Sequence, residues 1–149
     1  MKSLFIYYSR TGNGDLVAEM LKEKGFDIEK VETLKNLIPK SFVLSMFIGG
    51  FNAAIGAHPK IKELVVNPEL YDEIYIGSPI WNARFATPTN SLLKELKLEG
   101  KKVTFVLYSG SGTSKGATKK INKLYPEARI INLKEPLKYK EEAANKLSF

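Results

Sequence analysis

Short apolar runs rich in β-branched and aromatic residues alternate along the chain with segments whose apolar residues recur every three or four positions. The apolar runs predict strands at Ser3–Tyr8, Phe26–Glu32, Glu73–Pro79, Lys102–Gly110 and Ala128–Leu133. The second run alternates with charged residues, which favours a strand near the sheet edge. Because helical stretches separate the strands, we expect a parallel sheet covered by helices on both faces.

The helical segments are recognised by their apolar spacing and by the residues at their ends. The residues that predict them are Leu16, Val17, Met20 and Leu21, followed by Gly25 as a terminator; Thr87 as N-cap with Pro88 in the first turn; Ala117, Ile121 and Leu124 on one face; and the final segment Tyr139–Leu147. The strand before the second of these helices is expected to end in a Gly-Ser-Pro turn.

The segment Ser41–Gly56 interrupts this alternation, because it is almost wholly apolar and contains two adjacent glycines. One interpretation is a buried helix that lies over the sheet. Another is an exposed apolar surface that covers a ligand or forms a dimer contact. The segment is too short for a membrane span, so we expect no stable membrane insertion.

Composition narrows the classes of function. The chain has 149 residues, which suits a single domain over residues 1–149. The absence of cysteine excludes disulfides, thiolate metal sites and cysteine nucleophiles. The first residues lead directly into an apolar strand without the pattern of a secretion signal, so we expect a cytoplasmic protein.

The net charge of +7 is unevenly distributed. Residues 101–149 carry 11 basic and 4 acidic side chains and therefore supply the whole excess. Such a surface suits an acidic partner, although solvated helix faces rich in lysine give the same pattern. Because no stacking aromatics are interleaved with the lysines, we expect no nucleic-acid partner.

Three unusual loops follow predicted strands, at Ser9–Gly14, Gly77–Arg84 and Ser109–Gly116. The carboxyl ends of parallel strands meet at one edge of a sheet, where ligands bind at the point at which the strand order reverses. We therefore expect the three loops to lie together.

The first loop has the chemistry that a phosphate group requires. Ser9 and Thr11 offer hydroxyl groups, Gly12 and Gly14 allow a close approach of the backbone, and Arg10 could add a positive charge. The N–H groups that begin the next helix would point at the anion. A tight capped turn without a ligand is the alternative.

The other two loops suit a planar ring. Trp81 is the only tryptophan, and it either stacks on a heterocycle or packs under the neighbouring helix. The third loop is rich in serine and glycine, so it either presents backbone donors to a heterocycle or is a flexible connection.

Taken together, the motifs YSRTGNG, IGSPIWNARFATP and LYSGSGTSKGA resemble the three flavin loops of the flavodoxin-like FMN-binding family, in its short form. The resemblance covers residues 1–25 and 72–149. It implies an α/β fold, namely a flavodoxin-like three-layer sandwich with a five-stranded parallel sheet in the order 2-1-3-4-5, which this family shares.

The resemblance also implies FMN as cofactor. Carried over to this sequence, the residues around the phosphate are Ser9, Arg10, Thr11, Gly12, Asn13 and Gly14. Those along the isoalloxazine ring are Pro79, Ile80, Trp81, Asn82 and Ala83, and those at its pyrimidine side are Ser109, Gly110, Ser111 and Gly112.

Three features depart from the family pattern. Gly14 stands where the family usually has threonine, and Asp15 places a negative charge beside the expected phosphate. The third loop lacks an aromatic residue to cover the outer flavin face, and the chain is basic where other flavodoxins are acidic.

We expect a carrier of electrons between redox partners, one of which is an acidic protein. The alternative is an FMN-dependent NAD(P)H:quinone or flavin oxidoreductase, for which the uncovered flavin face would leave room. A third reading is a binding protein that lost tight FMN binding through Gly14. The pattern is compatible with a monomer or a homodimer.

Overall fold

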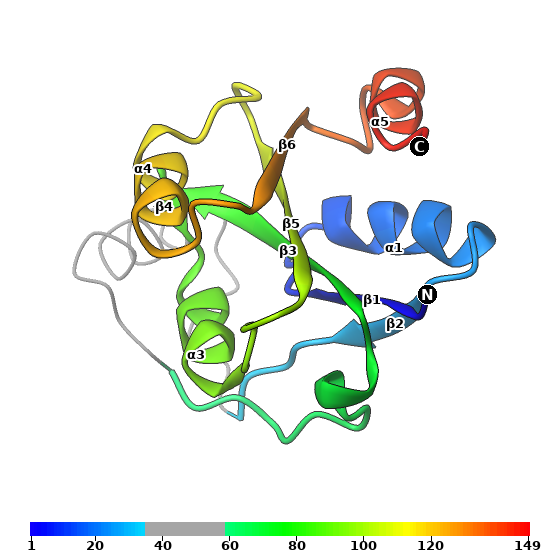
Figure 1. Ribbon diagram of the computed structural model, residues 1–149. Helices are drawn as coiled ribbons and strands as arrows, with labels where there is room; N and C mark the ends of the chain where they lie inside the picture. The colour runs from blue at the N-terminus through cyan, green and yellow to red at the C-terminus, as the bar shows by residue number, and fades with distance from the viewer. Residues whose placement is uncertain (35–58) are drawn as a thin grey trace.

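The computed structural model describes residues 1–34 and 59–149, and its centre is a parallel sheet (Figure 1). The strands follow the order β2-β1-β3-β5-β6. Their bounds are β1 Ser3–Tyr7, β2 Asp27–Lys30, β3 Glu73–Trp81, β5 Lys102–Ser109 and β6 Arg129–Lys134. All neighbours on this path pair in parallel. The expected order 2-1-3-4-5 is confirmed for the parallel strands. The segment Ser41–Gly56 lies outside the described residues.

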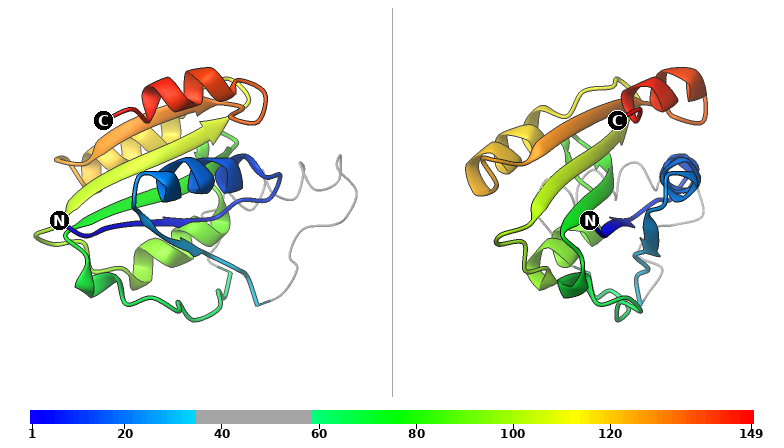
Figure 2. Two further views of the ribbon diagram at one scale, coloured as in Figure 1. Left: turned by 90° about the vertical axis from the view of Figure 1, so that its right-hand side faces the viewer. Right: turned by 45° about the vertical axis from the view of Figure 1, so that its right-hand side comes forward.

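Helices cover both faces of the sheet. Their bounds are α1 Asn13–Glu23, α3 Thr87–Glu95, α4 Lys115–Leu124 and α5 Lys140–Lys146, with a short 3₁₀ turn, η1, at Pro68–Leu70. Figure 2 shows α1 and α5 on one face and α3 and α4 on the other, which gives the expected three layers. Within the described ranges, none of the helices has the length and hydropathy that a membrane crossing requires.

Two apolar cores result from the alternation of side chains along the strands. On the α3 and α4 face, Leu4, Ile6 and Ile76 pack with Leu92 and Ile121. On the α1 and α5 face, the alternate strand residues pack against these two helices; they include Phe5, Tyr75, Val106, Val17, Leu21 and Ala143. Sheet residues buried on both faces explain why the strands appear in the sequence as continuous apolar runs.

The expected Gly-Ser-Pro turn at the end of the third strand is wrong. β3 continues through Gly77–Pro79 to Trp81, and it then folds back as the short antiparallel strand β4, Arg84–Phe85. Pro79 has no N–H to donate, but its carbonyl accepts a hydrogen bond from Ala86 N–H, at 3.1 Å. The strand therefore ends two residues later than expected, at Trp81, and the turn is formed by Asn82 and Ala83.

Two details of the helices also differ from the expectation. Ala86, not Thr87, is the N-cap of α3, and Thr87 is buried as the first helical residue. The Ala86 N–H is held by Ser78 Oγ at 3.3 Å, so the strand end fixes where the helix begins. In α4, Ala117 and Ile121 are buried as expected, but Leu124, the last residue of the helix, is 53% exposed.

Candidate functional site

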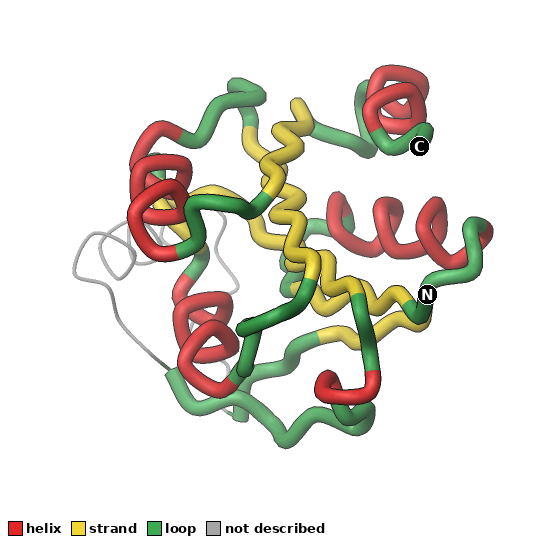
Figure 3. Tube along the Cα trace, viewed as in Figure 1, coloured by secondary structure: helices red, strands yellow, loops and turns green. Residues whose placement is uncertain are grey.

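The carboxyl ends of β1, β3 and β5 lie next to one another, as the tube in Figure 3 shows. Tyr8 N–H donates to Gly77 O at 3.1 Å, and Pro79 is in register with Tyr108. The Tyr108 hydroxyl donates to Tyr8 O. The loops that follow these strands are therefore brought to one edge of the sheet.

The turn between β1 and α1 presents backbone donors at the start of a helix. Gly12 is the N-cap in a left-handed conformation, with φ of 95°, and it has no side chain that could cap the helix. Within residues 1–34 and 59–149, no protein group accepts a hydrogen bond from the backbone N–H of Thr11, Gly12 or Asn13. These N–H groups lie at the positive end of the helix dipole, so the turn is suited to an anion.

The side chains of this turn have different roles. Ser9 is 8% exposed, and its Oγ accepts the N–H of Gly14 at 3.0 Å, so it braces the turn from inside. Arg10 and Thr11 are exposed. Asn13 Oδ1 accepts the N–H of Leu137 at 3.0 Å, which joins the turn to the connection between β6 and α5.

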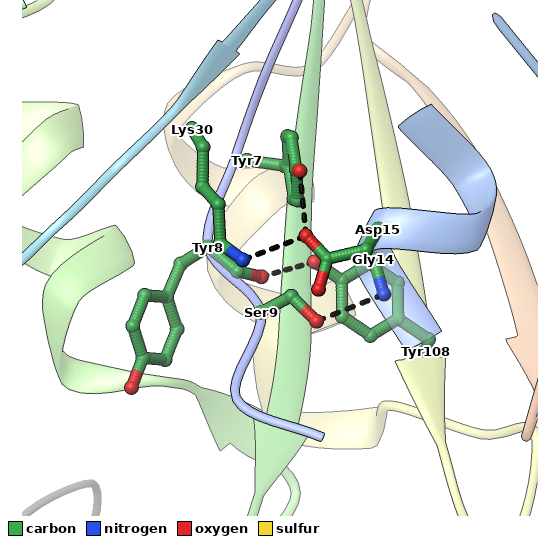
Figure 4. Close-up of polar contacts among 7 residues, drawn as sticks. All are labelled: Tyr7, Tyr8, Ser9, Gly14, Asp15, Lys30 and Tyr108. Carbon is green, nitrogen blue, oxygen red and sulfur yellow. Dashed lines mark hydrogen bonds and ion pairs between the residues drawn. The ribbon is translucent and has the colours of Figure 1, made fainter. Parts of the chain in front are cut away.

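The presence of glycine at position 14 has a steric explanation. A Cβ atom at this position would lie 2.5 Å from Tyr108 Oη and 2.8 Å from Ser9 Cβ. Tyr108 is 2% exposed, and its ring occupies the space beside the turn (Figure 4). The threonine of the family pattern would therefore force Tyr108 and Ser9 to shift.

The negative charge of Asp15 is compensated by its neighbours. Its Oδ1 accepts from the Tyr7 hydroxyl and from Lys30 Nζ, each at 2.7 Å (Figure 4). Partial burial acts to raise the pKa of Asp15, but the hydrogen bonds from Lys30 and Tyr7 outweigh it and the pKa lies below its ordinary value. Burial, followed by the hydrogen bond to Asp15, raises the pKa of Tyr7 far above its usual range. An anion in the turn would therefore lie beside a paired carboxylate.

The residues predicted to lie along the isoalloxazine ring belong partly to a strand and partly to a tight turn. Pro79, Ile80 and Trp81 are half-buried at the end of β3, and the Trp81 ring lies edge-on to the Tyr8 ring, with centroids 5.9 Å apart. Asn82 and Ala83 are exposed, with φ of 51° and 62°. This left-handed geometry is strained for alanine.

Helix α4 holds the Asn82–Ala83 turn in place. Ala117 N–H donates to Ala83 O at 2.9 Å. A Cβ atom at Gly116 would lie 2.7 Å from the same oxygen, so the close contact requires glycine. The strained turn is thus fixed from behind while its outer side remains exposed.

The third loop is held by its own hydroxyl groups. Ser109 Oγ donates to Thr113 O at 3.0 Å, and Ser111 Oγ and Thr113 Oγ1 are 2.8 Å apart. Gly110 has open space beside it, and Gly112 has a left-handed φ of 75°. The structure therefore gives this loop an ordered shape and leaves its glycine backbone accessible.

Sequence reasoning missed three contributors to the site, namely Tyr108, Lys30 and Leu137. Each reaches the first turn from a different strand or from the loop after the last one. Only Tyr108 left a signal in the sequence, because glycine in place of a larger residue indicates that another group fills the space.

The fold and the edge site together define an open α/β protein with a turn of unpaired backbone N–H groups at the strand-order switch point, as far as the described residues show. A sequence model described as flavodoxin matches residues 52–145, which is more than half of the chain. The protein therefore belongs to the flavodoxin family, the FMN-binding family that its motifs resemble, as expected.

Solved structures agree with this fold. A flavoprotein from Lactobacillus acidophilus NCFM, solved in complex with FMN, is 23% identical, with a TM-score of 0.72 over 94% of this chain and 97% of its own. A candidate flavoprotein from Bacteroides uniformis ATCC 8492 is 23% identical, with a TM-score of 0.68 over 95% of this chain and 96% of its own. A comparison with curated proteins finds no match.

Proposed function

We propose that this protein binds FMN at the carboxyl edge of its sheet and carries electrons between redox partners. The observation that carries the proposal is the set of N–H groups at Thr11, Gly12 and Asn13, which lead into α1 and have no protein acceptor among the described residues. The paired Asp15 supports it, because an unpaired carboxylate beside a phosphate would oppose binding. The Lactobacillus acidophilus relative was solved with FMN.

FMN, when bound, supplies the electron-transfer chemistry, and the chain binds and orients it. The first turn would hold the phosphate through its backbone N–H groups. Trp81, which stands at the end of β3, would lie along the ring, and the open backbone at Gly110 would face its polar side. Gly14 removes one hydroxyl donor of the family pattern, but it leaves the backbone donors in place.

Comparing two flavins tests the cofactor assignment. FMN and riboflavin differ only in the phosphate, and Trp81 is the single tryptophan, so its emission reports on a ring nearby. We expect FMN to quench this emission and to bind at least about tenfold more tightly than riboflavin, since hydrogen bonds to a charged group contribute roughly 1.5–3 kcal/mol. Equal affinity for the two flavins would overturn the phosphate assignment.

Anaerobic reduction separates a carrier from the oxidoreductase alternative. We expect holoprotein mixed with NADPH to keep its flavin absorbance, and dithionite to reduce it in two resolved one-electron steps. Rapid bleaching by NADPH would overturn the carrier assignment and support an NAD(P)H:quinone or flavin oxidoreductase.

A further inference from the structure

A concave basic surface lies beside the Asn82–Ala83 turn. Residues of β4, α3 and α4 line it, and Figure 1 shows where these three elements lie. Its cavity volume is about 380 Å³. Four cationic side chains line it, and no acidic side chain does; we call them the basic cluster, and they are Arg84, Lys119, Lys120 and Lys123. The cluster forms because α4 buries Ala117 and Ile121, which turns its lysines outward.

Lys120 is held within the cluster by neutral groups. Its Nζ donates to Asn90 Oδ1 at 3.2 Å and lies 5.7 Å from the centre of the Phe85 ring. Partial burial and the positive charge of Lys94 on α3 lower its pKa. The local repulsion would be relieved by an anion from outside.

Two lysines of the cluster have no acidic partner in the described chain. Lys119 and Lys123 form no ion pair with any residue in 1–34 or 59–149. Residues 35–58, which lie outside the described part, contain no aspartate or glutamate. The cluster also belongs to the part of the sequence that supplies the whole net charge of +7.

The cluster is built directly on the turn that the proposed function places against the flavin. Arg84 follows Ala83, and the N–H of Ala117, which lies two residues before Lys119, donates to Ala83 O. A partner that docks here is therefore brought close to the redox group, as efficient electron transfer requires.

We propose that the basic cluster is the docking surface for an acidic redox protein, whose carboxylate side chains enter the cavity between β4, α3 and α4. This inference rests on the proposed function, because it names the class of partner. A protein partner accounts for charges that two separate elements, β4 and α4, contribute, and the excess over residues 101–149 would steer its approach.

A charge-neutralising variant tests the inference. The probe is a small acidic plant-type ferredoxin, titrated into FMN-loaded protein by calorimetry at low and high salt. Lys119, Lys120 and Lys123 are replaced together by glutamine. We expect the variant to bind at least about tenfold more weakly at low salt, and the difference to shrink at high salt, since charge steering and complementarity are screened by ions.

The matched control removes the same charge from the opposite face, with Lys22, Lys24 and Lys140 replaced by glutamine. The docking surface would be overturned if both triple variants bound the ferredoxin more weakly to the same extent. It would also be overturned if the wild type did not bind the ferredoxin at low salt. Tight NADPH binding that only the Lys119, Lys120 and Lys123 variant loses would overturn it in favour of a nucleotide site. Wild-type protein that stays colourless with FMN would overturn the proposed function instead.

Discussion

The two turns at the carboxyl edge of the sheet are built in opposite ways. In the Ser9–Gly14 turn, glycine takes the left-handed position and the nearby Asp15 is paired with Lys30 and Tyr7. In the Asn82–Ala83 turn, non-glycine residues take left-handed positions, and the adjacent surface carries lysines without acidic partners in the described chain. Of these two turns, the second thus has the strained backbone and the lysines without acidic partners in the described chain. Such features often mark the part of a site that changes state or meets a partner, whereas a relaxed turn only holds its ligand.

We expect the largest effect on stability from a substitution that disrupts the Ser9–Gly14 turn. Gly14→Ala places a Cβ atom 2.5 Å from Tyr108 Oη, so we expect a loss of about 1–3 kcal/mol in the free energy of unfolding, measured by urea denaturation without flavin. Gly110→Ala is the matched control, because nothing lies within 4 Å of a Cβ atom there.

Tyr108→Phe in the same background sharpens this prediction. Removing the hydroxyl relieves the closest contact, so the double variant should lose less stability than the two single variants together, by at least about 0.5 kcal/mol. Strict additivity would show that Tyr108 is not the reason for glycine at position 14.

We expect a smaller effect from a substitution that relieves backbone strain in the Asn82–Ala83 turn. Ala83 has a φ of 62°, and Ala83→Gly should stabilise the protein by about 1 kcal/mol, because glycine adopts this conformation without steric cost. Asn82→Gly is the control. Asparagine tolerates φ of 51°, so its replacement should change the thermal midpoint much less. A loss of stability in Ala83→Gly would contradict the assignment of strain.

We expect the smallest effect from a substitution that removes the positive charge paired with Asp15, next to the Ser9–Gly14 turn. Lys30→Gln leaves Asp15 without its cation, and we expect FMN to bind about two- to fivefold more weakly while riboflavin is unaffected, since exposed ion pairs contribute roughly 0.2–1 kcal/mol. Lys62→Gln, which breaks the surface pair with Glu32, is the control. Equal weakening of both flavins would contradict an electrostatic effect on the phosphate.

Acid titration checks the same contact. The pKa of Asp15 in the folded protein is below its ordinary 3.8, so the contact contributes fully above that pH and is lost as pH falls through the lowered value. Wild-type protein should therefore lose slightly more stability below about pH 4 than Asp15→Asn does. If the two proteins lose stability identically as the pH falls, the charge of Asp15 does not contribute to the stability of the fold.

The arrangement of strands was predictable because it depends on local pattern. Buried runs such as Lys102–Ser109 are apolar throughout, and a parallel sheet joined by helices has few permitted orders. The end of β3 was not predictable from Gly77–Pro79, since these residues are common in turns. Their place in the strand depends on pairing with β5 and β4.

The candidate site, like the fold, was predictable only where it depends on local sequence. The sequence motifs located the three loops, because glycine and hydroxyl residues cluster there. They did not show that Ser9 turns inward to Gly14 N–H, or that Tyr108 fills the place of a side chain at position 14. These contacts join segments far apart in the chain, so no local pattern encodes them.

The hydrogen bond from Leu137 to Asn13 spans 124 positions of the sequence. During synthesis, the amino-terminal turn leaves the ribosome long before the residue that braces it exists. Uptake of a prosthetic group should therefore wait until translation is nearly finished, and chains shortened before Leu137 should emerge without colour.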